Sequence, residues 1–227
     1  MRMKLVFAVL LICICSSFGA CNNAGKQKNA SVIGDSYVAY NEFIRDFFSE
    51  LKKDFNTGRL RYSLALIDDD DIPELIISYG DFHAAGVKIC FYDPEKKRVL
   101  ETNGDKELYG ENGGFKYYVR KSCIYDYYFN GGTAYVSFCR IERSGDEYTV
   151  KKGADLKQSF SDDMHYYVDS AEVTQEDYEA AYDKEAAELA DLKPVSVEYG
   201  DMSGTYETAY GDDWLSVFQT MYETLKN

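Results

Sequence analysis

Hydrophobic positions recur with helical spacing near the start and near the end of the chain. One apolar stripe predicts a helix over residues 35–57, which Asp35 or Ser36 can cap. The same spacing predicts a second helix over residues 174–189, where Thr174 can act as the N-cap. A third apolar stripe predicts a final amphipathic helix over residues 214–225.

The region between the helices is rich in residues that favour β-strands and is divided by turn residues. Connections of only a few residues favour antiparallel pairing, because a parallel crossover needs a dozen or more residues. The sequence therefore predicts the α+β class, with an N-terminal helix, an antiparallel β-meander and two C-terminal helices packed on the sheet. The predicted strands are 61–67, 74–79, 87–92, 98–101, 115–120, 123–129, 133–141, 147–151 and 165–168.

The first twenty residues are typical of an export signal rather than of a folded element. Arg2 and Lys4 precede an apolar run, and small residues follow it up to Ala20. The sequence Phe18-Gly19-Ala20-Cys21 resembles the bacterial lipobox, a resemblance that implies lipid attachment at Cys21. We therefore expect a signal peptide over 1–20, a flexible tether over 21–34 and a single α+β domain over 35–227.

Charge limits the classes of partner. The formal net charge is −14, and loss of the two basic residues of the signal peptide makes it −16. Nucleic acids and anionic lipid headgroups need a basic surface, so this balance argues against both. We expect an extracellular protein, anchored to the outer face of the cytoplasmic membrane by its N-terminal lipid, that binds a glycan or a peptide.

Cysteine placement leaves room for at most one disulfide. Two of the six cysteines leave with the signal peptide and Cys21 is the lipid site, so Cys90, Cys123 and Cys139 remain. A three-residue turn at 130–132 would place Cys123 opposite Cys139 and permit a bridge between them, whereas a two-residue loop would spoil that register. The alternative is that the remaining cysteines are buried free thiols.

The most distinctive stretch is a run of four acids between two apolar segments, Leu-Ile-Asp-Asp-Asp-Asp-Ile-Pro-Glu-Leu-Ile-Ile, over residues 66–77. It resembles the Asp-rich calcium loops of integrin-type and VCBS-type repeats. It is most similar to the Asp-Gly-Asp-Gly-Ile-Pro-Glu-Leu loops of exported lipoproteins from clostridia-like bacteria.

The resemblance implies a set of calcium ligands within this loop. The first ligand position of the family falls on Leu66, whose side chain has no oxygen, and Asp71 stands where the family has a turn glycine. The alternative is a solvated acidic turn without a bound ion. The implied ligands are Asp68, Asp70, Ile72 through its backbone carbonyl, and Glu74.

No catalytic constellation stands out in the sequence. The chain has only two histidines, which excludes a His-rich zinc site, and no Gly-x-Ser-x-Gly motif is present. We expect a non-catalytic binding protein; the alternative is a cell-wall or polysaccharide-active hydrolase with paired carboxylates. Tyrosine-rich segments at 117–118, 125–129 and 166–167 are either half-buried strand faces or a platform for sugars or peptides.

Overall fold

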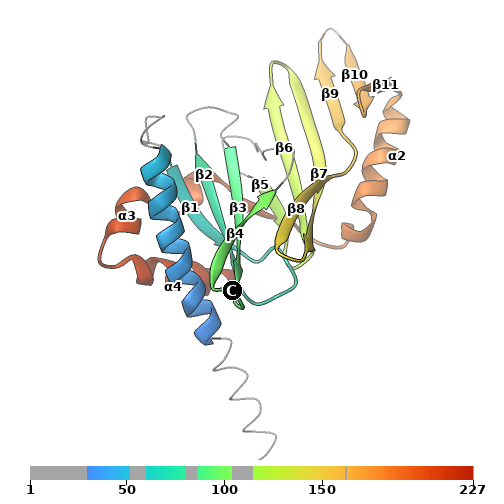
Figure 1. Cartoon of the computed structure of the whole chain (residues 1–227). Coiled ribbons are helices and arrows are strands. Elements are labelled where there is room, and N and C mark those ends of the chain that lie inside the picture. The colour runs from blue at the N-terminus through green and yellow to red at the C-terminus, as the bar shows by residue number, and fades with distance from the viewer. Residues whose placement is uncertain (1–29, 52–59, 80–85, 104–114, 162, 227) are drawn as a thin grey trace, which may run out of the picture.

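A mixed sheet forms the centre of the molecule, and helices lie against its outer faces (Figure 1). The computed structural model describes residues 30–51, 60–79, 86–103, 115–161 and 163–226. The strands within these ranges form one thirteen-stranded sheet. The predicted α+β class is therefore observed.

The first half of the sheet is an antiparallel meander in which strands adjacent in sequence are also adjacent in space. A two-residue strand, β13 (Gly204–Thr205), pairs with the other edge of β1. β2 and β3 are buried almost throughout, as continuous apolar runs predict for strands covered on both faces. The meander consists of β1 (Leu60–Ala65), β2 (Glu74–Tyr79), β3 (Gly86–Asp93) and β4 (Arg98–Asn103).

The second half is organised around β7 (Thr133–Ser144). One edge of β7 pairs with β6, and the other edge pairs with β8 near one end and β9 near the other. Beyond β9 the sheet continues through β10 to β11, and beyond β6 it continues through β5 to β12. These strands are β5 (Phe115–Tyr118), β6 (Cys123–Asn130), β8 (Glu147–Lys152), β9 (Leu156–Phe160), β10 (Met164–Val168), β11 (Ala171–Val173) and β12 (Val195–Val197).

The two halves meet through a short parallel pairing between β4 and β8. Thr102 lies opposite Tyr148 and Asn103 opposite Thr149. The prediction of a purely antiparallel sheet is therefore wrong at this one junction. Strands β5 to β7 lie between the two paired strands in sequence, and this long connection permits the parallel direction.

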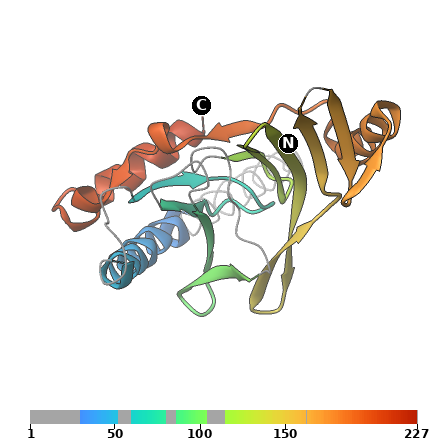
Figure 2. The ribbon, with the colours of Figure 1, turned by 90° about the horizontal axis from the view of Figure 1, so that it is seen from above.

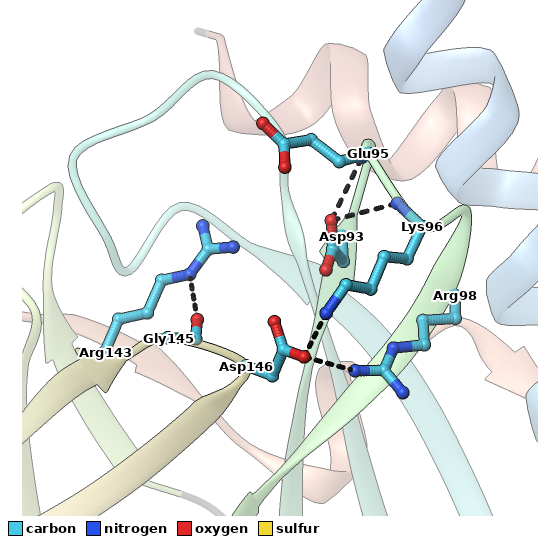
Figure 3. A network of polar contacts seen from close by, with 7 residues as sticks. All are labelled: Asp93, Glu95, Lys96, Arg98, Arg143, Gly145 and Asp146. Atoms are coloured by element: carbon cyan, nitrogen blue, oxygen red, sulfur yellow. Dashed lines mark hydrogen bonds and ion pairs between the residues drawn. The ribbon is translucent and has the colours of Figure 1, made fainter.

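An ion-pair network reinforces the junction where the β3–β4 turn meets the β7–β8 turn (Figure 3). The Asp146 carboxylate accepts from Lys96 Nζ and lies 3.3 Å from Arg98 Nη2. Asp93 closes its own turn by accepting from the backbone N–H groups of Glu95 and Lys96, at 3.0 and 3.2 Å. The network therefore links two turns about fifty positions apart in sequence.

Three hydrophobic clusters stabilise the fold. The inner cluster lies between the two halves of the sheet, which curve toward each other (Figure 2), and includes Ile76, Phe91 and Tyr148. The meander-helix cluster joins the outer face of β1–β4 to the N-terminal helix and α4, and includes Tyr62 and Phe218. The α2 cluster joins β6, β7 and β9 to α2, and includes Phe138, Leu156 and Tyr178.

The helices cover the outer faces of the sheet. Residues 30–51 are helical. The predicted N-cap of α2 is confirmed, since Thr174 Oγ1 accepts from the Asp177 N–H at 3.1 Å. The remaining helical elements are α2 (Gln175–Ala186), η3 (Ala187–Leu189), η4 (Tyr199–Asp201), α3 (Tyr206–Tyr210) and α4 (Trp214–Leu225).

The boundary between tether and domain differs from the prediction. Residues 30–34 are already helical, and Val32 and Ile33 pack against the meander-helix cluster. Ser36 is fully buried inside the helix, where its hydroxyl donates to the Ile33 carbonyl at 2.8 Å, so it is not the N-cap. Burial of Val32 and Ile33 compensates for the low helix propensity of Gly34.

The disulfide between Cys123 and Cys139 is not formed, because a two-residue turn sets a different register from the one that a bridge needs. Gly131 and Gly132 form the turn with positive φ values of 56° and 77°. Ile124 then lies opposite Cys139, and Cys123 belongs to the α2 cluster whereas Cys139 belongs to the inner cluster. Cys123 lies opposite Arg140, the residue next to Cys139, so the two cysteine side chains point to opposite faces of the sheet.

Candidate metal centre

The acidic turn between β1 and β2 is shaped by its own side chains. Asp68 Oδ1 accepts from the Asp70 N–H at 3.0 Å, and Asp70 Oδ1 accepts from the Ile72 N–H at 2.6 Å. Each bond reaches two residues ahead, which is the pattern that lets aspartate stabilise a turn. The two carboxylates are therefore fixed along the loop.

Glu74 is the buried member of the turn. It is the first residue of β2, and its side chain is 2% exposed. Its Oε2 atom accepts from the Ile67 N–H at 2.6 Å, a bond that spans the turn. Burial, followed by the negative charge of Asp68, raises the pKa of Glu74 well above its usual value.

Three carboxylates converge on one point. Oxygen atoms of Asp68, Asp70 and Glu74 all lie within 4.8 Å of one another. Loss of surrounding water, followed by the charge of Asp68, raises the pKa of Asp70 to about 6. The cluster can hold a metal ion, because a cation or a proton removes the repulsion between the acids.

Two aromatic hydroxyls hold the turn from the helix side. The Tyr40 hydroxyl on the N-terminal helix donates to the Pro73 carbonyl at 2.8 Å, and Tyr40 is fully buried. The Tyr222 hydroxyl on α4 donates to the Asp71 carbonyl at 3.4 Å. The acidic turn therefore touches both helices that cover the meander.

Arg120 also holds the turn. Its guanidinium donates to the Asp70 carbonyl at 2.9 Å and to the Asp71 carboxylate at 2.6 Å. Its backbone N–H donates to the Leu66 carbonyl at 3.0 Å. Arg120 has a φ of 58°, a tight-turn conformation that brings both its backbone and its side chain to the loop.

The structure brings together three of the four predicted ligands. Asp68, Asp70 and Glu74 form the cluster, and Ile72 lies within the same turn, donating its N–H to Asp70 and packing its side chain on the meander-helix cluster. At the first family position, Leu66 is buried and its carbonyl already accepts from Arg120. A bound cation would therefore take its further oxygen ligands from groups other than Leu66.

Sequence reasoning did not identify the residues that position the turn. Tyr40, Arg120 and Tyr222 are distant from the loop in sequence, and no local spacing links them to it. Asp71 keeps a negative φ rather than replacing a left-handed glycine, and it forms an ion pair with Arg120 instead. Basic residues are common at the ends of strands, so Arg120 carried no signal of this contact.

Other predicted features lie near the N-terminus of the chain. The signal peptide over 1–20, Cys21 and tether residues up to 29 lie outside the described residues. In the described part of the chain, no helix is both long enough and apolar enough to span a membrane. Comparison with protein-family models, with curated proteins and with solved structures found no match to this chain.

Proposed function

We propose that this protein is a lipid-anchored extracytoplasmic binding protein whose first hairpin is stabilised by a calcium ion. The observation that carries the calcium site is the convergence of Asp68, Asp70 and Glu74 around a buried carboxylate. Three acids at this separation repel one another when ionised, and a divalent cation offsets that repulsion. The anchor rests on the lipobox resemblance at Cys21.

Calcium suits this site better than a softer metal. The cluster offers only carboxylate oxygens, which are ligands for hard cations. Calcium accepts six to eight oxygens in flexible geometry, so the Ile72 carbonyl and water molecules can complete its coordination. Magnesium requires a stricter octahedron, which three carboxylates on one turn fit less well.

A hydrolase is the alternative function, and this cluster gives it little support. Paired carboxylates in glycoside hydrolysis must both reach the scissile bond. Glu74 is 2% exposed, and its Oε2 atom is engaged by the Ile67 N–H. A non-catalytic role fits these carboxylates better.

The calcium proposal is tested by thermal unfolding of the soluble domain in EDTA and in millimolar calcium. We expect calcium to raise the Tm, and we expect Asp70→Ala to abolish the rise, because the mutation removes one ligand of three. Asp69→Ala is the matched control, since Asp69 is exposed on the same turn and lies outside the cluster. An unchanged Tm in the wild-type domain at millimolar calcium would overturn the proposal.

The anchor is tested separately by metabolic acyl labelling of the full chain. Wild-type protein should carry lipid and sediment with membranes, and Cys21→Ala should do neither. A mature chain that begins at another residue and carries no lipid would refute the anchor without affecting the calcium site.

A further inference from the structure

Three side chains form a line across the second half of the sheet. Tyr135 on β7 lies opposite Lys157 on β9, and Lys157 lies opposite Tyr167 on β10. Residues paired in this way point to the same face of a sheet. Lys157 Nζ lies 5.8 Å from the Tyr135 ring centroid and 4.7 Å from that of Tyr167. We call these three residues the tyrosine row.

The tyrosine row lies on the face opposite α2. Val136, Leu156 and Tyr166, each adjacent in sequence to a row residue, belong to the α2 cluster. Neighbouring residues of a strand point to opposite faces, so the row faces away from α2. Among the described helices, α2 is the one that covers this end of the sheet (Figure 1). The row residues are partly exposed.

Hydrogen-bonding groups lie next to the rings in a second line. Thr133 lies opposite Ser159, with their hydroxyl oxygens 3.3 Å apart, and Ser159 lies opposite His165. His165 Nδ1 lies 2.8 Å from a carboxylate oxygen of Glu172 on β11. The face therefore combines flat aromatic rings with hydroxyl, imidazole and carboxylate groups.

We propose that the tyrosine row binds an extended, neutral β-1,4-linked glycan. Tyr135 and Tyr167 are two strands apart, about 10 Å at the usual strand spacing. This spacing matches every second sugar ring of an extended β-1,4 chain, whose apolar ring faces stack on aromatic side chains. Lys157 lies between the rings and supplies a donor for the sugar between them.

The same features disfavour other partners. A peptide that adds to a sheet needs a free edge, and both β9 and β10 are paired on each side. A polyanionic glycan would meet a chain of formal net charge −14 and the Glu172 carboxylate. A neutral glycan is not repelled by the negative charge. It can stack on the rings across the strands, so it needs no free strand edge.

This inference rests on the binding role proposed above and is tested with the soluble domain by calorimetric titration with chitohexaose and cellohexaose. We expect at least one hexasaccharide to bind. Tyr135→Ala and Tyr167→Ala should each weaken binding about tenfold, equivalent to about 1.4 kcal/mol. Tyr167→Phe keeps the ring and should keep most of the affinity.

Phe160→Ala is the matched control, because Phe160 is 46% exposed and lies outside the row on the α2 face. It should bind like wild type, and circular dichroism will show whether each variant is folded. The proposal would be overturned if neither hexasaccharide binds, or if both alanine variants bind with the affinity of the wild type. The calcium-dependent Tm rise is measured on the same samples, so its persistence without glycan binding would leave the calcium site standing.

Discussion

The two halves of the sheet differ in how many of their faces are buried. In β2 and β3 nearly every residue is buried, because the inner cluster covers one face and the meander-helix cluster covers the other. In β10 no residue is fully buried. The contrast is visible in the sequence as a continuous apolar run at 75–77 and a mixed run at 164–168. The first half is therefore packed on both faces, whereas β10, toward the far end of the second half, presents its side chains to solvent.

The acidic turn belongs to the first half, which is packed on both faces, and the tyrosine row crosses the more exposed β9–β10 end of the second half. Tyr40 and Arg120 hold the backbone of the turn, and the three carboxylates accept from backbone N–H groups without a bound ion. Among the described helices, α2 covers the opposite face of the sheet behind the tyrosine row. Stability and recognition should therefore respond to different substitutions.

The largest expected effect on stability comes from a cavity in β2, in the first half of the sheet. Ile77→Ala removes a fully buried side chain of β2 and should lower the free energy of unfolding by about 2–5 kcal/mol. Tyr167→Ala should change it by about 0.5 kcal/mol or less, as for most surface substitutions. Urea unfolding of both variants measures the difference. Equal losses would show that the two halves are packed equally tightly.

The second effect is a pH dependence that should arise in the acidic turn. The folded-state pKa of Asp70, about 6, lies above its usual 3.8, so its contribution to stability is full below about pH 4. As the pH rises through 6, that contribution is lost, because the ionised carboxylate is poorly solvated in the fold and meets the charge of Asp68. Solvent screening limits the loss to about 1 kcal/mol.

Urea unfolding in EDTA between pH 4 and pH 7.5 measures this loss as the difference between wild type and Asp70→Asn. Asparagine keeps an oxygen that can accept from Ile72 and removes the charge. Wild type should lose stability relative to the variant as the pH rises, and calcium should restore it at neutral pH. A constant difference across the window would contradict the assigned pKa.

Much of the meander could be predicted from the sequence because its signals are local. The apolar runs of β2 and β3, and the turn at 93–97, each identify their element without distant contacts. The two-residue strand β13 and the three-residue β12 could not be predicted, since their pairing partners lie far away in sequence. The parallel contact of β4 with β8 depends on how the two halves curve, and no local pattern encodes it.

The candidate site likewise has one part that could be predicted from the sequence and another that depends on tertiary packing. The resemblance to Asp-rich calcium loops implied that Asp68, Asp70 and Glu74 lie together, and they do. The burial of Glu74 and the contacts of Arg120 depend on tertiary packing, which no local pattern of residues encodes. The tyrosine row was not predicted, because only Tyr167 of its three residues lies in a Tyr-rich segment and the alignment of the row requires the register of three strands.

The smallest expected effect concerns the junction between the halves. Asp146 is the shared partner of Lys96 and Arg98, and Lys96 lowers its pKa, so its contribution is present above pH 3.8 and lost as the pH falls below that value. Asp146→Asn should lower the Tm slightly at neutral pH, and molar salt should remove the difference, because salt screens exposed charges. Glu147→Gln, an exposed neighbour on the same turn, serves as the control. A loss that persists in molar salt would mean that Asp146 contributes through turn geometry rather than through the ion pairs, and the two halves would then depend on their shared inner cluster and the β4–β8 pairing.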